Sequence, residues 1–483
     1  MMAKLVRHLV PFHGTRSVTG PFTWRQRQIW RDMEVVPEAA YQVTQVMPVP
    51  GGLTVEDVLA RIGVIVSRHE ALRSLFGVDH GGEPGQRVLS AGVVAVDVLT
   101  VESRGETDLG RVLREAESGL ADRPYDPAAD LPFRALVCVI DDAPGMVILC
   151  ASHLAADLTS MRLLVGELSE EVSAAAEGRA PTPPPRSRTP VDQALWEGSA
   201  EGRGRLEAAL RYWAEQLALA PPQIFPPAAG PASTPRFWRG GLVSRAVPVA
   251  LRTLATACHT TTSMVLLAAT AALLGRMTGR PRCALRLVAP NRLAPELRYA
   301  VGHLAQEIVA TIDVDGELFE DVVRETWSAA VRAYRHGLYD PRHADRLVRD
   351  VAVARGTVID LSCYYDDQWV DPCRRREWTL LPPADLRAAL ADTVFRWEDR
   401  TEEDSLTFSL EVYDVFGEPD MIRISLMADT RYIPPGSIEA FLRGLERLLV
   451  TLTDGEVRLA EIHRPAGAAG GGTGDGTDGR ADD

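Results

Sequence analysis

The stretch that decides the fold runs from Cys150 to Ser160 and reads CASHLAADLTS. A short apolar run, 146–150, leads into it and predicts a strand covered on both faces. Beyond it, apolar residues recur at spacings of three and four over 161–172, which predicts a helix with one side facing a core. Thr159 or Ser160 is expected to cap this helix, because a hydroxyl oxygen can accept from a first-turn N–H. The stretch therefore reads as a strand, a loop and a helix.

Two residues of this loop, His153 and Asp157, are suited to chemistry. An imidazole titrates near neutral pH, so it can take a proton from an amine or alcohol that attacks a carbonyl and return it to the leaving group. A charge such as Asp157 needs a partner in a loop of this kind, and we expect an arginine from elsewhere in the chain. Taken alone, the two residues also fit a buried histidine bonded to the backbone beside an ordinary surface aspartate.

The same loop resembles the HHxxxDG signature of nonribosomal peptide condensation domains, part of the chloramphenicol acetyltransferase-like superfamily of carrier- or coenzyme A-dependent acyltransferases. His153 stands at the second histidine and Asp157 at the aspartate, whereas Ser152 replaces the first histidine and Leu158 the glycine. The resemblance implies that His153 is catalytic and that Asp157 makes a structural ion pair. Ser152 is expected to affect loop support. Leu158 places a side chain near the expected entry of a thioester arm and makes a positive φ costly.

A second motif closes a predicted amphipathic helix that begins at Thr54. Residues 68–76 read RHEALRSLF and match the RHExLRxxF motif of the same family. We expect Arg68, Glu70 and Arg73 to lock the end of the helix and the following strand by ion pairs, without taking part in catalysis.

Later motifs supply candidate partners for the histidine loop. Residues 290–297, PNRLAPEL, resemble a family loop that contains an arginine and ends in Pro-Glu-Leu. Arg292 is therefore the candidate partner of Asp157 across two lobes, the alternative being an exposed arginine. Residues 301–306, VGHLAQ, resemble the family's G-x-F-x-N. Within them, His303 either faces a channel or packs in the core.

The chain of 483 residues is long enough for two or three domains. Proline-rich residues 178–190 predict a semi-rigid connection. We expect an N-terminal lobe at 1–177, a C-terminal lobe at 191–463 and a disordered Gly-rich tail at 464–483. The resemblance covers nearly the whole chain and implies an α/β (α+β) fold with two chloramphenicol acetyltransferase-like lobes in a V shape around a central channel.

Composition narrows the classes of function. With 46% apolar and 24% charged residues and no apolar run of about 18 residues, the chain predicts a soluble globular protein without a membrane span. No secretion signal is recognisable, so a cytoplasmic location is expected. A net charge of −14 argues against general nucleic-acid binding. The six cysteines show no CxxC pair and read as reduced core residues, with neither a zinc site nor disulfides.

The resemblance implies an enzyme of natural-product biosynthesis that moves an acyl or aminoacyl group from a phosphopantetheine thioester to an amine or hydroxyl. Nothing resembles an adenylation or carrier domain, so we expect a free-standing enzyme that meets its acyl or peptidyl carrier protein in trans and binds no cofactor of its own. One alternative is an acyltransferase that uses coenzyme A. Another is a catalytically silent relative that recruits a carrier or partner enzyme. Ser152 and Leu158 favour the silent relative, whereas the intact His153 and Asp157 favour catalysis.

Overall fold

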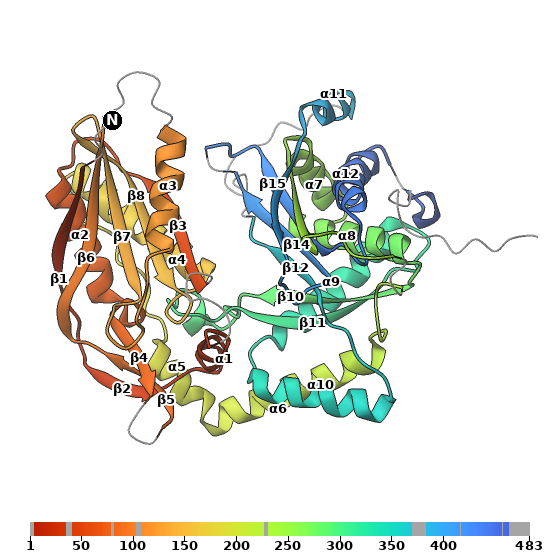
Figure 1. Cartoon of the computed structure of the whole chain (residues 1–483), viewed down its shortest axis with the longest axis horizontal. Helices are drawn as coiled ribbons and strands as arrows, with labels where there is room; N and C mark the ends of the chain where they lie inside the picture. Colours follow the sequence, from red (N-terminus) through yellow and green to blue (C-terminus); the bar gives the residue numbers. More distant parts are fainter. Residues whose placement is uncertain are drawn as a thin grey trace, which may run out of the picture. The chain divides into compact units, whose positions relative to one another are not determined.

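The computed structural model shows a chain built from two compact units (Figure 1). It describes residues 4–34, 41–78, 82–102, 109–226, 230–369, 383–415, 417–455 and 457–462. Unit 1 comprises Met1–Arg211, Ala289–Gln306 and Arg335–Leu347, and unit 2 comprises Tyr212–Val288, Glu307–Tyr334 and Val348–Asp483. The predicted Gly-rich tail at 464–483 lies outside the described residues.

The contacts divide the chain at a different place from the proline-rich segment 178–190. Unit 1 continues through α5 (Pro190–Glu197), which packs on β2 (Val18–Pro21), and ends inside α6 (Ala200–Leu219). Two later stretches of the chain also return to unit 1. Proline content marks a connection, but it does not show which later segments pack on which core.

Unit 1 contains a five-stranded sheet with the strand order β1-β6-β7-β8-β3. These strands are β1 (Lys4–His13), β6 (Ala91–Val101), β7 (Phe133–Ile140), β8 (Ala143–Ser152) and β3 (Gln42–Pro48). Neighbours are antiparallel except β6 and β7, which are parallel. A small sheet pairs β2 with β5 (Pro84–Val88) and β5 with β4 (Ser74–Val78). The other helices of this part of the chain are α1 (Trp24–Asp32), α2 (Val55–Arg68), the 3-10 helix η2 (Glu70–Arg73), α3 (Leu109–Ala121), α4 (Leu158–Ala176) and η3 (Pro295–Leu297).

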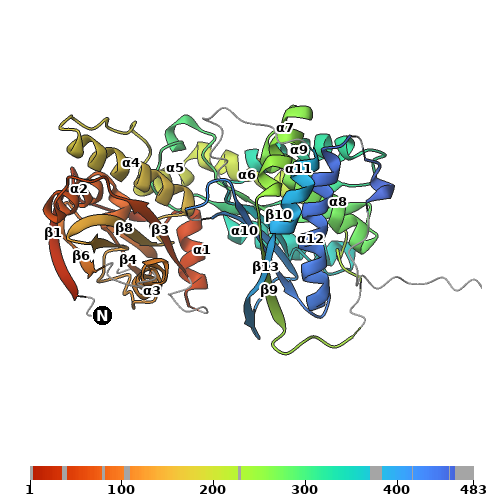
Figure 2. The ribbon, with the colours of Figure 1, turned by 90° about the horizontal axis from the view of Figure 1, so that it is seen from above.

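The strand predicted at 146–150 is the core of β8, and both of its faces are buried. Val147 and Leu149 belong to a large cluster shared with α2 and α4, whereas Ile148 and Cys150 belong to a second cluster with residues of α3. Figure 2 shows α2 and α4 on one side of this sheet and α3 on the other. The predicted strand, loop and helix are therefore confirmed, with the loop emerging from a strand that is fixed on both faces.

Unit 2 contains a seven-stranded sheet in the order β11-β10-β12-β14-β15-β9-β13. Its strands are β11 (Gln306–Asp313), β10 (Arg282–Ala289), β12 (Cys363–Asp367), β14 (Phe408–Asp414), β15 (Ile422–Asp429), β9 (Phe237–Ser244) and β13 (Val394–Thr401). The pairs β10–β12 and β12–β14 are parallel, and the pairs from β14 to β13 are antiparallel.

Helices of unit 2 pack on one another and on this sheet. They are α7 (Ala246–Ala257), α8 (Thr262–Thr278), α9 (Phe319–Arg335), α11 (Pro383–Ala388) and α12 (Pro435–Leu452), with short 3-10 helices η5 (Ala389–Asp392) and η6 (Leu459–Glu461); α10 (Pro341–Arg355) begins in unit 1 and ends in unit 2. α12 contacts α7, α8, β9 and β15, and Figure 2 shows α8 and α12 on the same face of the sheet. Among the described residues, no single helix is long and apolar enough to cross a membrane, whereas α7 and α8, taken together as a bent pair, have the required length and composition.

Candidate functional site

The loop between β8 and α4 holds His153 by its main chain. The His153 N–H donates to the Tyr41 carbonyl at 2.7 Å, and the N–H groups of Ala155 and Ala156 donate to the Ser152 carbonyl at 2.8 and 3.0 Å. The Ser152 side chain is fully buried, and its Oγ accepts from the Leu154 N–H at 3.3 Å. Ser152 thus lies inside the turn, in the position to support the loop that the sequence predicts.

The ring of His153 is half-buried, and one of its nitrogens is bonded to the main chain. Nδ1 lies 3.0 Å from the carbonyl oxygen of Ala156. Because a carbonyl oxygen can only accept, the neutral ring carries its hydrogen on Nδ1 and its lone pair on Nε2. Nε2 is therefore the nitrogen that can accept a proton.

Asp157 is the N-cap of α4, so the prediction of Thr159 or Ser160 as the cap is wrong. Its Oδ1 accepts from the Ser160 N–H at 2.8 Å. A carboxylate at this position is favoured by the positive end of the helix as well as by the hydrogen bond. Leu158, which replaces the family's glycine, is the half-buried first residue of the helix. The cap residue and the start of the helix therefore follow the histidine directly.

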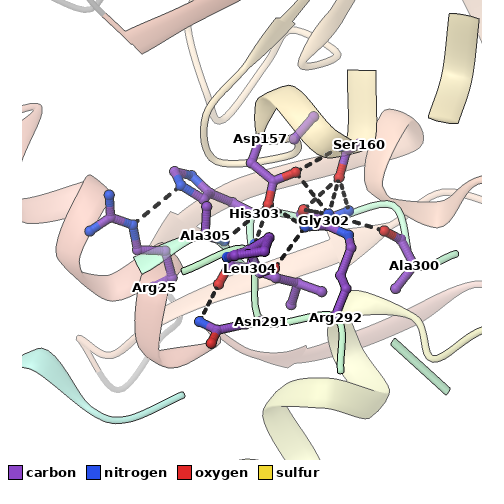
Figure 3. A network of polar contacts seen from close by, with 12 residues as sticks. Arg25, Asp157, Ser160, Asn291, Arg292, Ala300, Gly302, His303, Leu304 and Ala305 are labelled. Carbon is purple, nitrogen blue, oxygen red and sulfur yellow. Dashed lines mark hydrogen bonds and ion pairs between the residues drawn. The ribbon is translucent and has the colours of Figure 1, made fainter. Parts of the chain in front are cut away.

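Asp157 also forms the predicted ion pair with Arg292 (Figure 3). Arg292 Nη2 donates to Oδ1 at 2.8 Å and Nη1 donates to Oδ2 at 2.9 Å, while Oδ2 accepts from the N–H groups of Leu304 and Ala305 at 3.0 Å each. Burial alone would raise the pKa of Asp157, but the Arg292 charge and these hydrogen bonds hold it well below its usual range. Both partners belong to unit 1, so the pair lies within one unit and not across two lobes.

Ser160 ties the helix to the loop at 301–306. Its Oγ donates to the Gly302 carbonyl at 2.7 Å and accepts from the Gly302 N–H at 3.0 Å and from Arg292 Nη2 at 2.8 Å. The sequence singles out Ser160 only as a helix cap. A hydroxyl three residues after the loop aspartate was a usable signal, although its partners are distant in the chain.

Asn291 is a second residue whose role the sequence does not reveal. Its φ of 55° lies in the left-handed region, which asparagine tolerates better than most residues. Its side-chain Nδ2 donates to the carbonyls of Leu304 and Gly337 at 2.7 and 2.9 Å. Asn291 therefore orients the chain just before Arg292 and supports the loop that Asp157 binds.

His303 is buried beside His153, with the two ring centroids 4.8 Å apart. Its Nδ1 lies 2.6 Å from the His153 carbonyl oxygen, and Arg25 Nε donates to its Nε2 at 3.3 Å. Burial, followed by the Arg25 charge, lowers the pKa of His303 well below its usual value, so the ring is neutral. His303 also borders a small cavity of unit 1 whose volume, about 10 Å³, corresponds to roughly one water molecule.

Two further groups of residues hold the His153 loop and α4 in place. In α1, Thr23 and Gln26 form a reciprocal capping box, and the Gln26 side chain donates to the Leu154 carbonyl at 3.0 Å. In the RHEALRSLF motif, Arg68 donates to Glu167 and Glu171 of α4 at 2.9 and 2.8 Å, and Glu70 accepts from Arg16 at 2.6 and 2.9 Å. Arg73 is buried, and its Nη1 donates to the Arg16 carbonyl at 3.1 Å. The ion pairs predicted for Arg68, Glu70 and Arg73 are present.

No group of three or more histidine, cysteine, aspartate or glutamate residues suited to a metal ion occurs in the part of the chain that the structure describes. The loop supplies a proton acceptor, His153 Nε2, on a main chain that is bonded at several points. This arrangement is suited to proton transfer to or from a substrate.

A family model described as Condensation domain matches residues 21–367, and the chain belongs to this family. The isonitrile lipopeptide synthase of Mycobacterium tuberculosis is 27% identical over 406 residues, which make up 81% of this chain but only 16% of that protein. Condensation domains act in natural-product synthesis of the nonribosomal peptide type and are generally acyltransferases. The predicted family is therefore confirmed.

Solved structures show the same fold. The first condensation domain of the CDA synthetase has a TM-score of 0.68 and 17% identity, with 92% of this chain and 99% of that chain covered. The X-domain in complex with OxyB from teicoplanin biosynthesis has a TM-score of 0.64 and 19% identity, with 93% and 96% covered. The mixed helix and sheet fold of chloramphenicol acetyltransferase type, predicted from the sequence, is thereby confirmed.

Proposed function

We propose that the protein is a free-standing condensation enzyme of natural-product biosynthesis. It transfers an acyl or aminoacyl group from the phosphopantetheine thioester of a carrier protein, met in trans in the cytoplasm, to an amine or hydroxyl acceptor. The observation that carries this proposal is the hydrogen bond between His153 Nδ1 and the Ala156 carbonyl at 3.0 Å, which leaves Nε2 as the proton acceptor. The enzyme itself binds no cofactor, because the thioester arm arrives with the carrier.

In this reaction the acceptor attacks the thioester carbonyl, and His153 Nε2 takes the proton that the nucleophile loses. The C–S bond then breaks, and the thiol of the carrier arm leaves with a proton returned by His153. The N–H groups at the start of α4, near Leu158, are the proposed donors to the oxyanion of the intermediate. Asp157 and Arg292 take no proton, because the low pKa of Asp157 keeps the pair ionised. Their role is to hold the loop.

Two alternative functions compete with this proposal. The silent recruiter is favoured by Ser152 and Leu158, which replace two signature residues, and by the likeness to an X-domain that forms a complex with another protein. The coenzyme A-dependent acyltransferase differs only in the thioester donor. The intact His153 and its fixed tautomer favour transfer over recruitment.

One assay separates these functions. Purified protein is incubated with an acyl-carrier thioester and an amine acceptor, and in a parallel reaction with the corresponding acyl-coenzyme A. We expect His153→Ala to lower kcat by about 10²- to 10⁴-fold, the usual contribution of general base catalysis, whereas His13→Ala, at an exposed position of β1, should match the wild type.

The outcomes distinguish the three functions and test the role of His153. Turnover with acyl-coenzyme A but not with the acyl-carrier thioester supports the coenzyme A-dependent acyltransferase. Carrier binding without turnover by the wild type supports the recruiter. Equal turnover by His153→Ala and the wild type contradicts the role of His153.

A further inference from the structure

The His303 loop is fastened to the His153 loop on both sides of the His303 ring. Before the ring, Gly302 exchanges hydrogen bonds with Ser160 Oγ at 2.7 and 3.0 Å. After it, the N–H groups of Leu304 and Ala305 donate to Asp157 at 3.0 Å. Figure 3 shows the His303 ring on the side of these contacts that faces Arg25. These main-chain contacts thus fix the position of His303 independently of the hydrogen bonds of its ring.

The two ring nitrogens of His303 have opposite partners. The His153 carbonyl oxygen, 2.6 Å from Nδ1, can only accept, and the Arg25 guanidinium, 3.3 Å from Nε2, can only donate. The ring therefore carries its hydrogen on Nδ1 alone. A second proton on Nε2 would oppose the Arg25 N–H, which agrees with the low pKa of His303. The charged groups around the ring are Arg25 and Asp157, with Arg292 paired to Asp157, and His153 is the other titratable neighbour.

We propose that His303 is a positioning residue for His153. Its Nδ1–H holds the His153 carbonyl, while the His153 N–H is held by the Tyr41 carbonyl and the His153 ring by the Ala156 carbonyl. Rotation of the peptide that follows His153 would move Nε2 relative to a substrate. Arg25 sets the tautomer of His303 that makes this bond. The inference rests on the proposed function, because it concerns the placement of the proposed base.

Three substitutions of His303 distinguish the effect of its hydrogen bond to the His153 carbonyl from the effect of the ring's volume. His303→Asn places an amide N–H near the position of Nδ1 and can still donate to the His153 carbonyl. His303→Gln places its amide near Nε2, beside Arg25, and His303→Phe keeps a ring without either bond. A small displacement of a catalytic group can cost up to about 100-fold in rate. We therefore expect kcat to fall about 10- to 100-fold in the Gln and Phe variants. In the Asn variant kcat should stay within about threefold of the wild-type value, and KM for the carrier thioester should be unchanged in all three.

A nitrogen NMR measurement tests the geometry without turnover. In protein labelled with ¹⁵N in its histidine rings, the His303 resonances, assigned by their loss in His303→Asn, should show the neutral tautomer with hydrogen on Nδ1 from about pH 5.5 to 8. Hydrogen on Nε2, or a charged ring in this range, overturns the inference.

The outcomes distinguish this inference from the proposed function. If the wild type turns over and all three variants match it, His303 does not position His153, although the function stands. If Asn, Gln and Phe lose activity equally, His303 has a general structural role and the inference fails. If the wild type gives no transfer with either donor, the proposed function fails, and the positioning role fails with it even where the NMR tautomer is as expected.

Discussion

Replacing Asp157 by asparagine changes one atom of the ion pair with Arg292 and affects every contact of the carboxylate. The carboxylate accepts five hydrogen bonds, from the N–H groups of Ser160, Leu304 and Ala305 and from both terminal nitrogens of Arg292. Every one of these partners donates. The amide NH₂ of an asparagine would face at least two of them in either orientation, since Oδ1 and Oδ2 each accept from more than one donor. The substitution therefore replaces attraction by repulsion on one side of the carboxylate.

The size of the effect follows from burial. The side chains of Arg292 and Asp157 are only 7% and 3% exposed, so the substitution leaves a buried guanidinium without its counter-charge. Removing one partner of such a pair costs about 3–5 kcal/mol, because the remaining charge stays out of water. Asp157→Asn should therefore destabilise unit 1 by about this amount. Adding Arg292→Met should recover part of the loss, because no uncompensated charge then remains.

Hydrogen exchange measures this loss at the site itself, which suits a chain with two units whose unfolding need not be two-state. Peptides that cover 153–161 and 301–306 should lose between roughly a hundredfold and a few thousandfold of protection, the equivalent of 3–5 kcal/mol. The matched control is Glu115→Gln, which breaks an exposed pair with Arg111. A loss no larger than that of this control, about 1 kcal/mol or less, would refute the argument from burial.

Two other substitutions test the packing around the loop. Burial raises the pKa of Glu197, which accepts from the Trp24 N–H at 2.6 Å, to about 8. The folded state keeps this proton longer than the unfolded state, so stability should fall as the pH rises from about 4.5 to 8, and Glu197→Gln should flatten that slope in urea unfolding at a series of pH values. Arg68→Met removes hydrogen bonds to Glu167 and Glu171 and should cost unit 1 about 1–3 kcal/mol in the same assay. A wild-type slope in the glutamine variant, or an unchanged midpoint in the methionine variant, would contradict these expectations.

Local pattern was enough to predict β8, the loop and α4. A continuous apolar run indicates a buried strand, and apolar residues spaced by three and four indicate a helix. The change from the first pattern to the second marks the loop between them. The cap was predicted wrongly because Asp157, Thr159 and Ser160 all favour N-caps and lie within four residues. The structure selects Asp157, whose carboxylate also pairs with Arg292.

Contacts distant in the chain were predictable only where a family motif marked them. The pair of Asp157 and Arg292 was predicted in this way, whereas the bonds of Ser160, Asn291 and Arg25 were not. Their residue types are common, and nothing in their spacing indicates partners that lie 13 to 278 positions away in the chain. The assignment of Arg292 to a separate lobe differs from the contacts for the same reason, since composition does not reveal that a later stretch returns to unit 1.

Unit 1 is built from separate stretches of the chain, and this has a consequence for folding during translation. Arg292 follows Asp157 by 135 residues, so a ribosome that adds 5–20 residues per second exposes the arginine roughly 7–30 s after the aspartate. During that interval Asp157 has been synthesised but its counter-charge has not. A fragment that stops before Arg292 would lack this counter-charge, whatever time it is given.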